Sequence, residues 1–197
     1  MRISTHPARR EMRSRTGPTA LLVASAVCLA TAPLLLPSSY SWVAHTTSES
    51  AAQGVEGAWL ARMGFLLWGF GVFWEVRLNR SRWDKWTRRF HVAFGVLMIA
   101  TAAFSARPWV ADAQFDPTED TLHSFTATAM GFAFALGVLG VMLHKLRRGS
   151  RRVMFDVVAM AAATLIPICM SIWGDVDGLL QRLMFLIAYA WYVREAL

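Results

Sequence analysis

Six apolar runs, separated by short polar segments, set the pattern of the chain. They cover residues 19–37, 58–76, 90–106, 121–143, 153–173 and 179–193. A helix needs about 17–25 apolar residues to cross a bilayer, so five runs are long enough, and the sixth is short unless it extends to Glu195. Backbone polar groups in a bilayer core must be hydrogen-bonded within the segment. The pattern therefore predicts an all-α fold, a membrane bundle of six transmembrane helices.

The charged residues between the runs change sign from one segment to the next. Seventeen of the 20 lysines and arginines fall in residues 1–18, 77–89 and 145–152 and at Arg194. The other segments carry three basic residues, Arg62, Arg107 and Arg182, and eight acidic ones. Basic loops of membrane proteins stay in the cytoplasm. The sequence therefore predicts a multi-pass protein of the cell inner (plasma) membrane with both termini cytoplasmic.

Composition agrees with this placement and limits the partners. Hydrophobic residues make up 55% of the 197 residues and charged residues 17%, which is more apolar than a soluble domain of this length. The net charge is +7, but the basic residues form short clusters between apolar runs, so no nucleic acid is expected as a partner. The expected domains are a basic, disordered cytoplasmic tail at 1–18 and a six-helix transmembrane domain at 19–197.

The first run has one alternative interpretation. A basic start, an apolar stretch and Ala-Thr-Ala at 30–32 are also typical of a cleaved signal peptide. The length of the run, which continues to residue 37, favours a retained helix. The two cysteines, Cys28 and Cys169, lie inside apolar runs without a CxxC pattern and are expected to be buried thiols.

Arg62 and Arg182 are the anomalies among the charged residues. Each lies in about the first turn of a helix that enters from the outer side, against the positive-inside bias and beside the positive end of the helix dipole. From there either side chain can reach water or headgroups, or pair with an outer carboxylate. The functional alternative is an anion site in which both guanidinium groups bind a phosphate or carboxylate.

His123, Ser48 and Glu49 lie on the same predicted side. His123 begins the fourth run and is expected either to bond to Asp120 or Glu119, or to act as a general base or headgroup contact. Ser48 and Glu49 are adjacent in the loop between the first two runs. No G-x-S-x-G surrounds Ser48, so a turn or helix cap is the simple interpretation and a nucleophile the alternative.

No cofactor and no metal are expected. A zinc site needs three or four ligands, and no His, Cys or carboxylate spacing typical of one occurs. A haem site would need axial ligands, and His91 and His144 each lie alone near a helix end, so none is expected.

Three further residues receive structural interpretations. Asp177 is predicted to cap the last helix. Glu75 and Asp156 are expected to form surface ion pairs with Arg77 and Arg152. The small residues of "GFLLWGFG" and "AMGFAFALGVLG" predict close packing inside the bundle, or a homodimer face.

Several short motifs resemble a family of small six-span bacterial membrane proteins, domain of unknown function 998. The motifs are "TSES" after the first run, "GAWLARMGF" at the second, "LH" at the fourth and "GLLQR" at the sixth. The resemblance covers about residues 19–193. It implies a fold and a location but no activity or catalytic residue. It also implies that six residues belong together on the outer side: Ser48, Glu49, Arg62, His123, Gln181 and Arg182.

Two functions of different classes follow. The first is a binding protein whose outer-facing polar vestibule holds a lipid headgroup or small anion, with Arg62 and Arg182 as clamps beside His123, Glu49 and Gln181. The second is a membrane enzyme, a hydrolase or transferase acting on a lipid or lipid-linked substrate. There His123 is the base, and Ser48 or a water molecule is the nucleophile. A small transporter or a structural subunit comes third. Membrane lipids, a second copy or another membrane protein are the expected partners.

Overall fold

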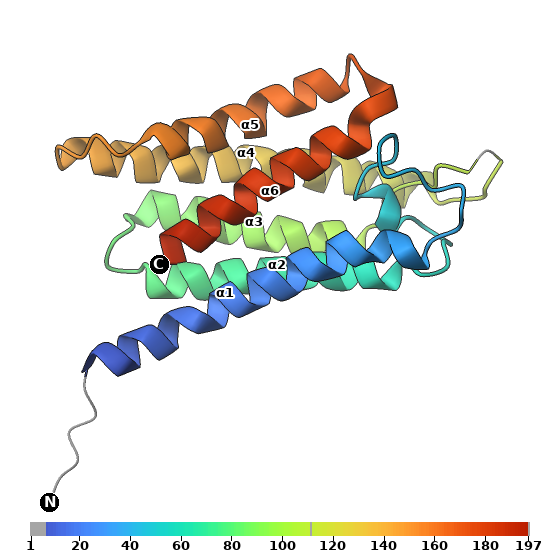
Figure 1. Cartoon of the computed structure of the whole chain (residues 1–197). Coiled ribbons are helices and arrows are strands. Elements are labelled where there is room, and N and C mark those ends of the chain that lie inside the picture. The colour runs from blue at the N-terminus through green and yellow to red at the C-terminus, as the bar shows by residue number, and fades with distance from the viewer. Residues whose placement is uncertain (1–6, 111, 197) are drawn as a thin grey trace, which may run out of the picture.

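The computed structural model describes residues 7–110 and 112–196 and is helical throughout (Figure 1). The long elements are α1 (Pro7–Thr31), α2 (Trp59–Leu78), α3 (Lys85–Ala103), α4 (Pro117–Arg147), α5 (Met154–Met170) and α6 (Asp177–Ala196). Three short 3-10 helices, η1 (Ala32–Leu35), η2 (Glu49–Ala51) and η3 (Gly174–Val176), lie between them. No strand occurs in the described part of the chain, so the predicted all-α class is confirmed.

Each helix packs against the next one in the sequence, and α6 returns to contact α1 and α2. The segments 36–58, 104–116 and 171–176 gather at one end of the bundle, called here the loop end (Figure 1). The turns at 79–84 and 148–153, the start of α1 and the end of α6 lie at the other, the basic end (Figure 1). This alternation matches the division of charges along the sequence.

Aromatic side chains of α6 form the centre of the bundle. Tyr189 stacks on Trp68 of α2 with ring centroids 3.8 Å apart, and Tyr192 contacts Phe94 of α3 and Phe134 of α4. Trp191 and Tyr192 are fully buried. The sixth helix therefore serves as the central element, and its short apolar run reflects contact with protein on several sides.

Small residues allow the helices to approach closely, as the glycine patterns predict. A Cβ on Gly69 of α2 would lie 2.8 Å from the carbonyl oxygen of Gly95 on α3, closer than van der Waals contact permits. A Cβ on Gly137 of α4 would lie 2.6 Å from the ring of His91. Gly131, in contrast, has open space beside it.

The surface of the bundle is rich in apolar side chains, whereas the surface of a soluble protein is more polar. Large apolar side chains are exposed on all six long helices, among them Phe70, Phe125, Leu165 and Leu186. Two helical segments, Thr16–Leu35 and Pro117–Arg147, are long and apolar enough to cross a membrane, and Met154–Met170 is apolar but shorter. The other three long helices carry charged residues, at both ends of α2 and α6 and at the start of α3, which lowers their mean hydropathy.

Two local expectations concern the ends of helices. Helix α1 begins at Pro7 and includes residues 7–18 of the predicted tail, while residues 1–6 lie outside the described residues. The division into tail and membrane domain stays a prediction. Asp177 does not cap α6, because the N–H groups of Gly178 and Leu179 donate to the carbonyls of Ala44 and Val43 instead.

Candidate functional site

Arg182 holds the loop of residues 38–57 against the start of α6. Its Nη1 donates to the carbonyl oxygens of Trp42 (2.8 Å) and His45 (2.9 Å), and its Nη2 donates to the Tyr40 hydroxyl (2.7 Å). The guanidinium also lies over the Trp42 ring, 4.7 Å from its centroid. Burial raises the pKa of Tyr40, and the nearby Arg182 charge opposes that rise. Arg182 therefore organises a loop through neutral acceptors.

Gly178 is required at this contact. Its Cβ, if present, would lie 2.6 Å from the carbonyl oxygen of Trp42 and closer still to that of His45. The loop backbone and the first turn of α6 thus pack without a side chain between them. The "GLLQR" motif is explained by this contact, because Gly178 permits the approach and Arg182 binds the carbonyls that approach.

Arg62 performs the same task from α2. Its Nε donates to the carbonyl of Ala51 (3.1 Å) and its Nη2 to that of Ala52 (3.0 Å). The three ion pairs in the described part of the chain all lie at the basic end, so neither Arg62 nor Arg182 is paired with a carboxylate there. Both arginines keep a positive charge at the loop end.

Glu49 forms a reciprocal cap with Thr46. The Thr46 N–H and hydroxyl both donate to Glu49 Oε2 (2.6 and 2.9 Å), and the Glu49 N–H donates to Thr46 Oγ1 (3.1 Å). This is the reciprocal hydrogen-bond pattern of a capping box, formed here in the turn that leads into η2. Burial, followed by the Glu49 charge, raises the pKa of Asp177.

Ser48 and Gln181 meet across the interface of loop and helix. The Ser48 N–H donates to Gln181 Oε1 (3.2 Å), and Gln181 Nε2 lies 3.5 Å from Ser48 Oγ. Five of the six family-like residues therefore lie on the loop 38–57 or bind it.

His123 belongs to a different contact. Its Nδ1 lies 2.8 Å from the Phe104 carbonyl in the loop 104–116, and its Nε2 is buried without a hydrogen-bond partner among the described residues. Neither Asp120 nor Glu119 bonds to it: they accept from the backbone N–H groups of Arg107 and Ser105. No hydrogen bond joins His123 to Ser48 within the part of the chain described.

The two loops at this end form one cap. Gln53 Nε2 donates to the carbonyls of Ser105 (2.9 Å) and Asp116 (3.1 Å), and the Asp116 N–H donates back to Gln53 Oε1 (2.7 Å). Trp109 adds a hydrogen bond to Ser39 (3.2 Å). The sequence does not indicate this role of Gln53, since a single glutamine in a polar loop belongs to no motif with a defined spacing.

A groove with a cavity volume of about 600 Å³ opens beneath this cap between α4, α5 and α6. Its walls come from within residues 127–135, 163–171 and 181–185, with Thr101 of α3 and Ser48 of the loop. Phe132, Ile168 and Thr128 on these walls are exposed, so the groove opens sideways to the surroundings of the bundle. We call it the lateral groove.

The lateral groove is mostly apolar, with scattered threonines on its walls, and it has a polar end. Met130, Ala135 and Met184 are among its apolar walls, while Ser48 and Gln181 stand where it meets the loop end. Pro167 lies on the α5 wall and has no N–H to donate to the carbonyl one turn earlier. The arrangement suits a molecule with an apolar body and a polar head.

At the basic end an ionic cluster joins the same three helices. Lys145 Nζ of α4 donates to both carboxylate oxygens of Asp156 on α5 (3.0 Å each) and to Glu195 Oε1 on α6 (2.7 Å). Trp191 Nε1 also donates to Asp156 (2.9 Å). Arg82, half exposed, lies 3.9 Å from Glu195.

This cluster corrects the expected surface pairs. Glu75 and Asp156 are both fully buried rather than on the surface, and Asp156 pairs with Lys145 rather than Arg152. Glu75 receives a hydrogen bond from Asn79 of its own helix. A sequence signal did exist, because Asp156 and Glu195 are among the few carboxylates at an end that carries mostly basic residues.

The described residues hold no group of three or more His, Cys, Asp or Glu side chains arranged to bind a metal ion. The absence of a cofactor therefore stays a prediction.

One family model matches this chain, over residues 19–196, and it is described as "Protein of unknown function (DUF998)". No match was found among curated proteins or solved structures. The match covers α2–α6 in full and about half of α1, and it contains both the loop-end cap and the lateral groove. The chain therefore belongs to the DUF998 family of proteins of unknown function.

Proposed function

We propose that this protein spans the membrane six times and binds a membrane lipid in the lateral groove, with the lipid's polar head at the loop end. Membrane insertion is supported by the surface of the bundle. Exposed apolar side chains surround it on every long helix, and an exposed apolar surface of that extent is rare on a soluble monomer. Polar residues such as Ser25, Thr101 and His91 are buried inside instead.

Orientation follows from the distribution of charge. The basic end carries 17 of the 20 lysines and arginines, counting residues 1–18 with it, and the positive-inside bias directs that end to the cytoplasm. The loop end and the lateral groove then face the outer leaflet of the cell membrane. Both termini are cytoplasmic in this arrangement.

The shape of the groove carries the proposal. It runs along about eight residues of α4, which corresponds to about 12 Å at the rise of an α-helix. Its side opening is bordered by exposed apolar residues, which in a bilayer contact acyl chains. A lipid can therefore enter sideways from the bilayer without crossing water, whereas a soluble ligand would have to cross lipid first.

The polar end completes the fit. Ser48 and Gln181 offer hydroxyl and amide groups to a lipid head at the mouth of the groove. Arg62 and Arg182 hold the loop that carries Ser48, and their charges favour a phosphate or another small anion near this end. His123 and Glu49 contribute by bracing the two loops of the cap.

Gly131 provides the test. It lies on the groove wall, and a Cβ added there meets nothing within 4 Å, so we expect Gly131→Phe to direct its ring into the groove and fill it. Gly131→Ala at the same position leaves most of the volume free and serves as the control. We expect native mass spectrometry of wild type and Gly131→Ala to show a retained phospholipid, and Gly131→Phe to lose it.

Equal phospholipid retention by Gly131→Phe and wild type would exclude the groove as the site. Absence of any retained phospholipid in wild type, after extraction into several mild detergents, would reject lipid binding altogether. Thermal unfolding midpoints of the three proteins confirm that the comparison is made between folded samples.

A second function, movement of the bound lipid across the bilayer, is favoured by one observation. The helices that line the groove in the outer half are joined at their inner ends by Lys145, Asp156 and Glu195. An opening on one side with a closure on the other is what alternating access requires. Reconstituted protein should then accelerate exchange of a fluorescent phospholipid between leaflets, and a rate equal to that of protein-free vesicles rejects this function.

A further inference from the structure

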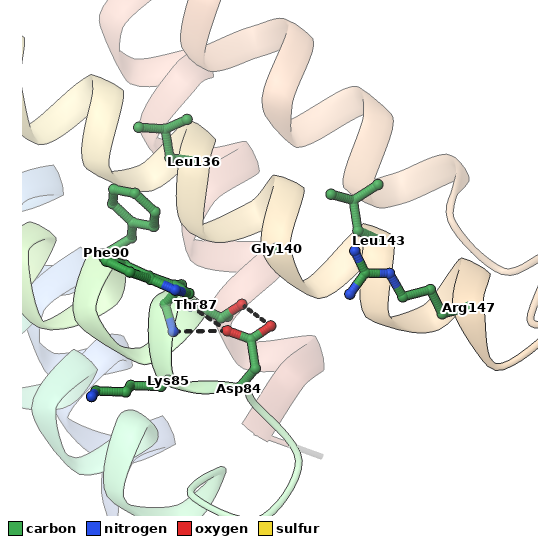
Figure 2. Close-up of a pocket in the computed structure, with 9 residues that line it drawn as sticks. Asp84, Lys85, Thr87, Phe90, Leu136, Gly140, Leu143 and Arg147 are labelled. Atoms are coloured by element: carbon green, nitrogen blue, oxygen red, sulfur yellow. Dashed lines mark hydrogen bonds between the residues drawn. The ribbon is translucent and has the colours of Figure 1, made fainter.

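A second groove lies at the basic end, between α3 and α4, with a cavity volume of about 480 Å³. Its walls are formed by the first turns of α3 and the last three turns of α4 (Figure 2). It shares no lining residue with the lateral groove. We call it the basic-end groove.

Two cations border this groove. Lys85 projects from the first turn of α3 and Arg147 from the last turn of α4, and Figure 2 shows them on opposite sides of Asp84, with the Lys85 side chain extending away from Arg147. Neither takes part in any of the three ion pairs in the described part of the chain. A third cation, Arg89, stacks on the exposed Trp86 ring at 4.8 Å.

The one carboxylate that lines the groove, Asp84, already accepts hydrogen bonds from backbone N–H groups. Asp84 Oδ1 accepts hydrogen bonds from the N–H groups of Trp86 (2.8 Å) and Thr87 (2.9 Å), and its Oδ2 accepts from the Thr87 hydroxyl (3.2 Å) (Figure 2). The hydrogen bond from the Thr87 backbone lowers the pKa of Asp84. Asp84 therefore caps α3, and the charges of Lys85 and Arg147 remain available to a ligand.

The deeper part of the groove is apolar. Phe90, Leu136 and Leu143 line it, and the Thr87 side chain packs directly against Gly140, which has no side chain of its own (Figure 2). The groove therefore combines a cationic rim at the helix ends with an apolar interior directed along the helices. Trp86, 65% exposed, lies at the rim, where tryptophans of membrane proteins meet the headgroups.

We propose that the basic-end groove binds an anionic phospholipid of the cytoplasmic leaflet. The phosphate lies at the cationic rim to which Lys85 and Arg147 belong, and the start of an acyl chain lies against Phe90 and Leu136. Basic pockets between membrane helices on the cytoplasmic side have the chemistry that such headgroups require. The proposal rests on the membrane orientation given above but not on lipid binding in the lateral groove.

The apolar interior decides between a lipid and a free anion. Inorganic phosphate or a soluble phosphate ester would use the cations alone and leave the apolar walls in contact with water. A phospholipid uses both parts. A zwitterionic lipid such as phosphatidylcholine carries its own cation and gains less from Lys85 and Arg147.

The experiment compares lipid retention in nanodiscs of equal parts phosphatidylglycerol and phosphatidylcholine, followed by native mass spectrometry. If each basic residue at the bound headgroup contributes about fivefold in affinity for anionic lipid, the double variant Lys85→Gln, Arg147→Gln should lower phosphatidylglycerol retention about 25-fold. The matched control is Arg80→Gln, Arg151→Gln, which removes two exposed cations from the same end but outside the groove. It should change retention less than about twofold.

A third variant, Leu143→Trp, keeps every charge and fills the groove from a half-exposed position. It should also reduce phosphatidylglycerol retention. Equal losses in the site and control variants would overturn the proposal in favour of a diffuse surface charge. Full retention by Leu143→Trp, equal retention of both lipids by wild type, or displacement of phosphatidylglycerol by millimolar inorganic phosphate would each overturn it as well.

Discussion

Lys145 is the single cation between two buried carboxylates, and its removal is the most severe test of the packing of α4, α5 and α6. The side chain of Asp156 is fully buried and that of Glu195 is 4% exposed, while that of Lys145 is 19% exposed. Substitution of Lys145 by Met keeps most of the side-chain volume and removes the charge. Both carboxylates then face one another's charge across the space that the ammonium group occupied.

The expected cost follows from this burial. Removing one member of a buried ion pair costs about 3–5 kcal/mol, because the partner is left charged and without compensation. The loss of a partner by two carboxylates would suggest a larger cost, but each carboxylate keeps one other contact. Trp191 continues to donate a hydrogen bond to Asp156, and Arg82 remains an ion-pair partner of Glu195. Lys145→Met should therefore lower the free energy of unfolding by about 3–5 kcal/mol.

The measurement is reversible unfolding in mixed micelles of a mild detergent and dodecyl sulfate. Lys85→Met, at the only other lysine and on an exposed position, is the control and should change the free energy of unfolding by less than about 0.5 kcal/mol. The triple variant Lys145→Met, Asp156→Asn, Glu195→Gln removes all three charges. Neutral amides keep the hydrogen-bonding groups, so the triple variant should recover most of the loss.

Two results would refute this reasoning. A loss of less than about 1 kcal/mol for Lys145→Met would mean that the carboxylates are hydrated or protonated rather than compensated by the lysine. A triple variant as unstable as the single one would mean that packing, and not charge, accounts for the effect.

Three other perturbations test the loop end and the helix caps. Gly178→Ala should lower the free energy of unfolding by about 1–3 kcal/mol because its Cβ meets the loop carbonyls, whereas Gly174→Ala, which meets open space, should have little effect. Arg182→Lys should raise hydrogen exchange of the loop 38–57 about tenfold, because one ammonium group cannot replace the bonds of the guanidinium to two carbonyls and a hydroxyl; unchanged exchange would argue that the loop folds without it. Asp84→Ala should destabilise by about 1 kcal/mol at neutral pH through loss of the α3 cap. Because the hydrogen bond from Thr87 lowers the pKa of Asp84, this difference between wild type and variant should persist above the ordinary carboxyl pKa and vanish as the pH falls through the lowered pKa; a difference that does not depend on pH would contradict it.

The helices and the grouping of their ends were predictable because both depend on the composition of short segments of the chain. Run length and composition indicate the helices, and the alternation of basic and polar segments indicates which helix ends lie together. Glycine spacing indicated close packing inside the bundle, and Gly69 and Gly137 do lie in such contacts. These features require no knowledge of which side chains meet across the bundle.

The partners of the charged residues were not predictable in the same way. Arg182 binds carbonyls of a loop about 140 residues earlier in the chain, and backbone acceptors leave no mark in a sequence. The expected pair of Glu75 with Arg77 fails because residues two apart on a helix point to different faces. The pair of Asp156 with Arg152 fails because α5 begins at Met154, so Arg152 precedes the helix.

The candidate site was also predictable only in part. The sequence indicated that Ser48, Glu49, Arg62, Gln181 and Arg182 belong together, and the structure brings them to one loop. It did not indicate the lateral groove, because a groove arises from the way α4, α5 and α6 diverge. Whether Arg62, Arg182 and His123 contact a ligand stays a prediction.

Lipid binding in the lateral groove is the central claim, and photo-crosslinking in intact membranes tests it most directly. A phospholipid with a diazirine on its acyl chain is incorporated into membranes that contain the wild-type protein, irradiated, and located by peptide mass spectrometry. The account predicts that cross-links concentrate within residues 127–135 and 163–171, and that Gly131→Phe removes them. Cross-links spread evenly over the exposed faces of all six long helices, or unchanged in Gly131→Phe, would contradict it.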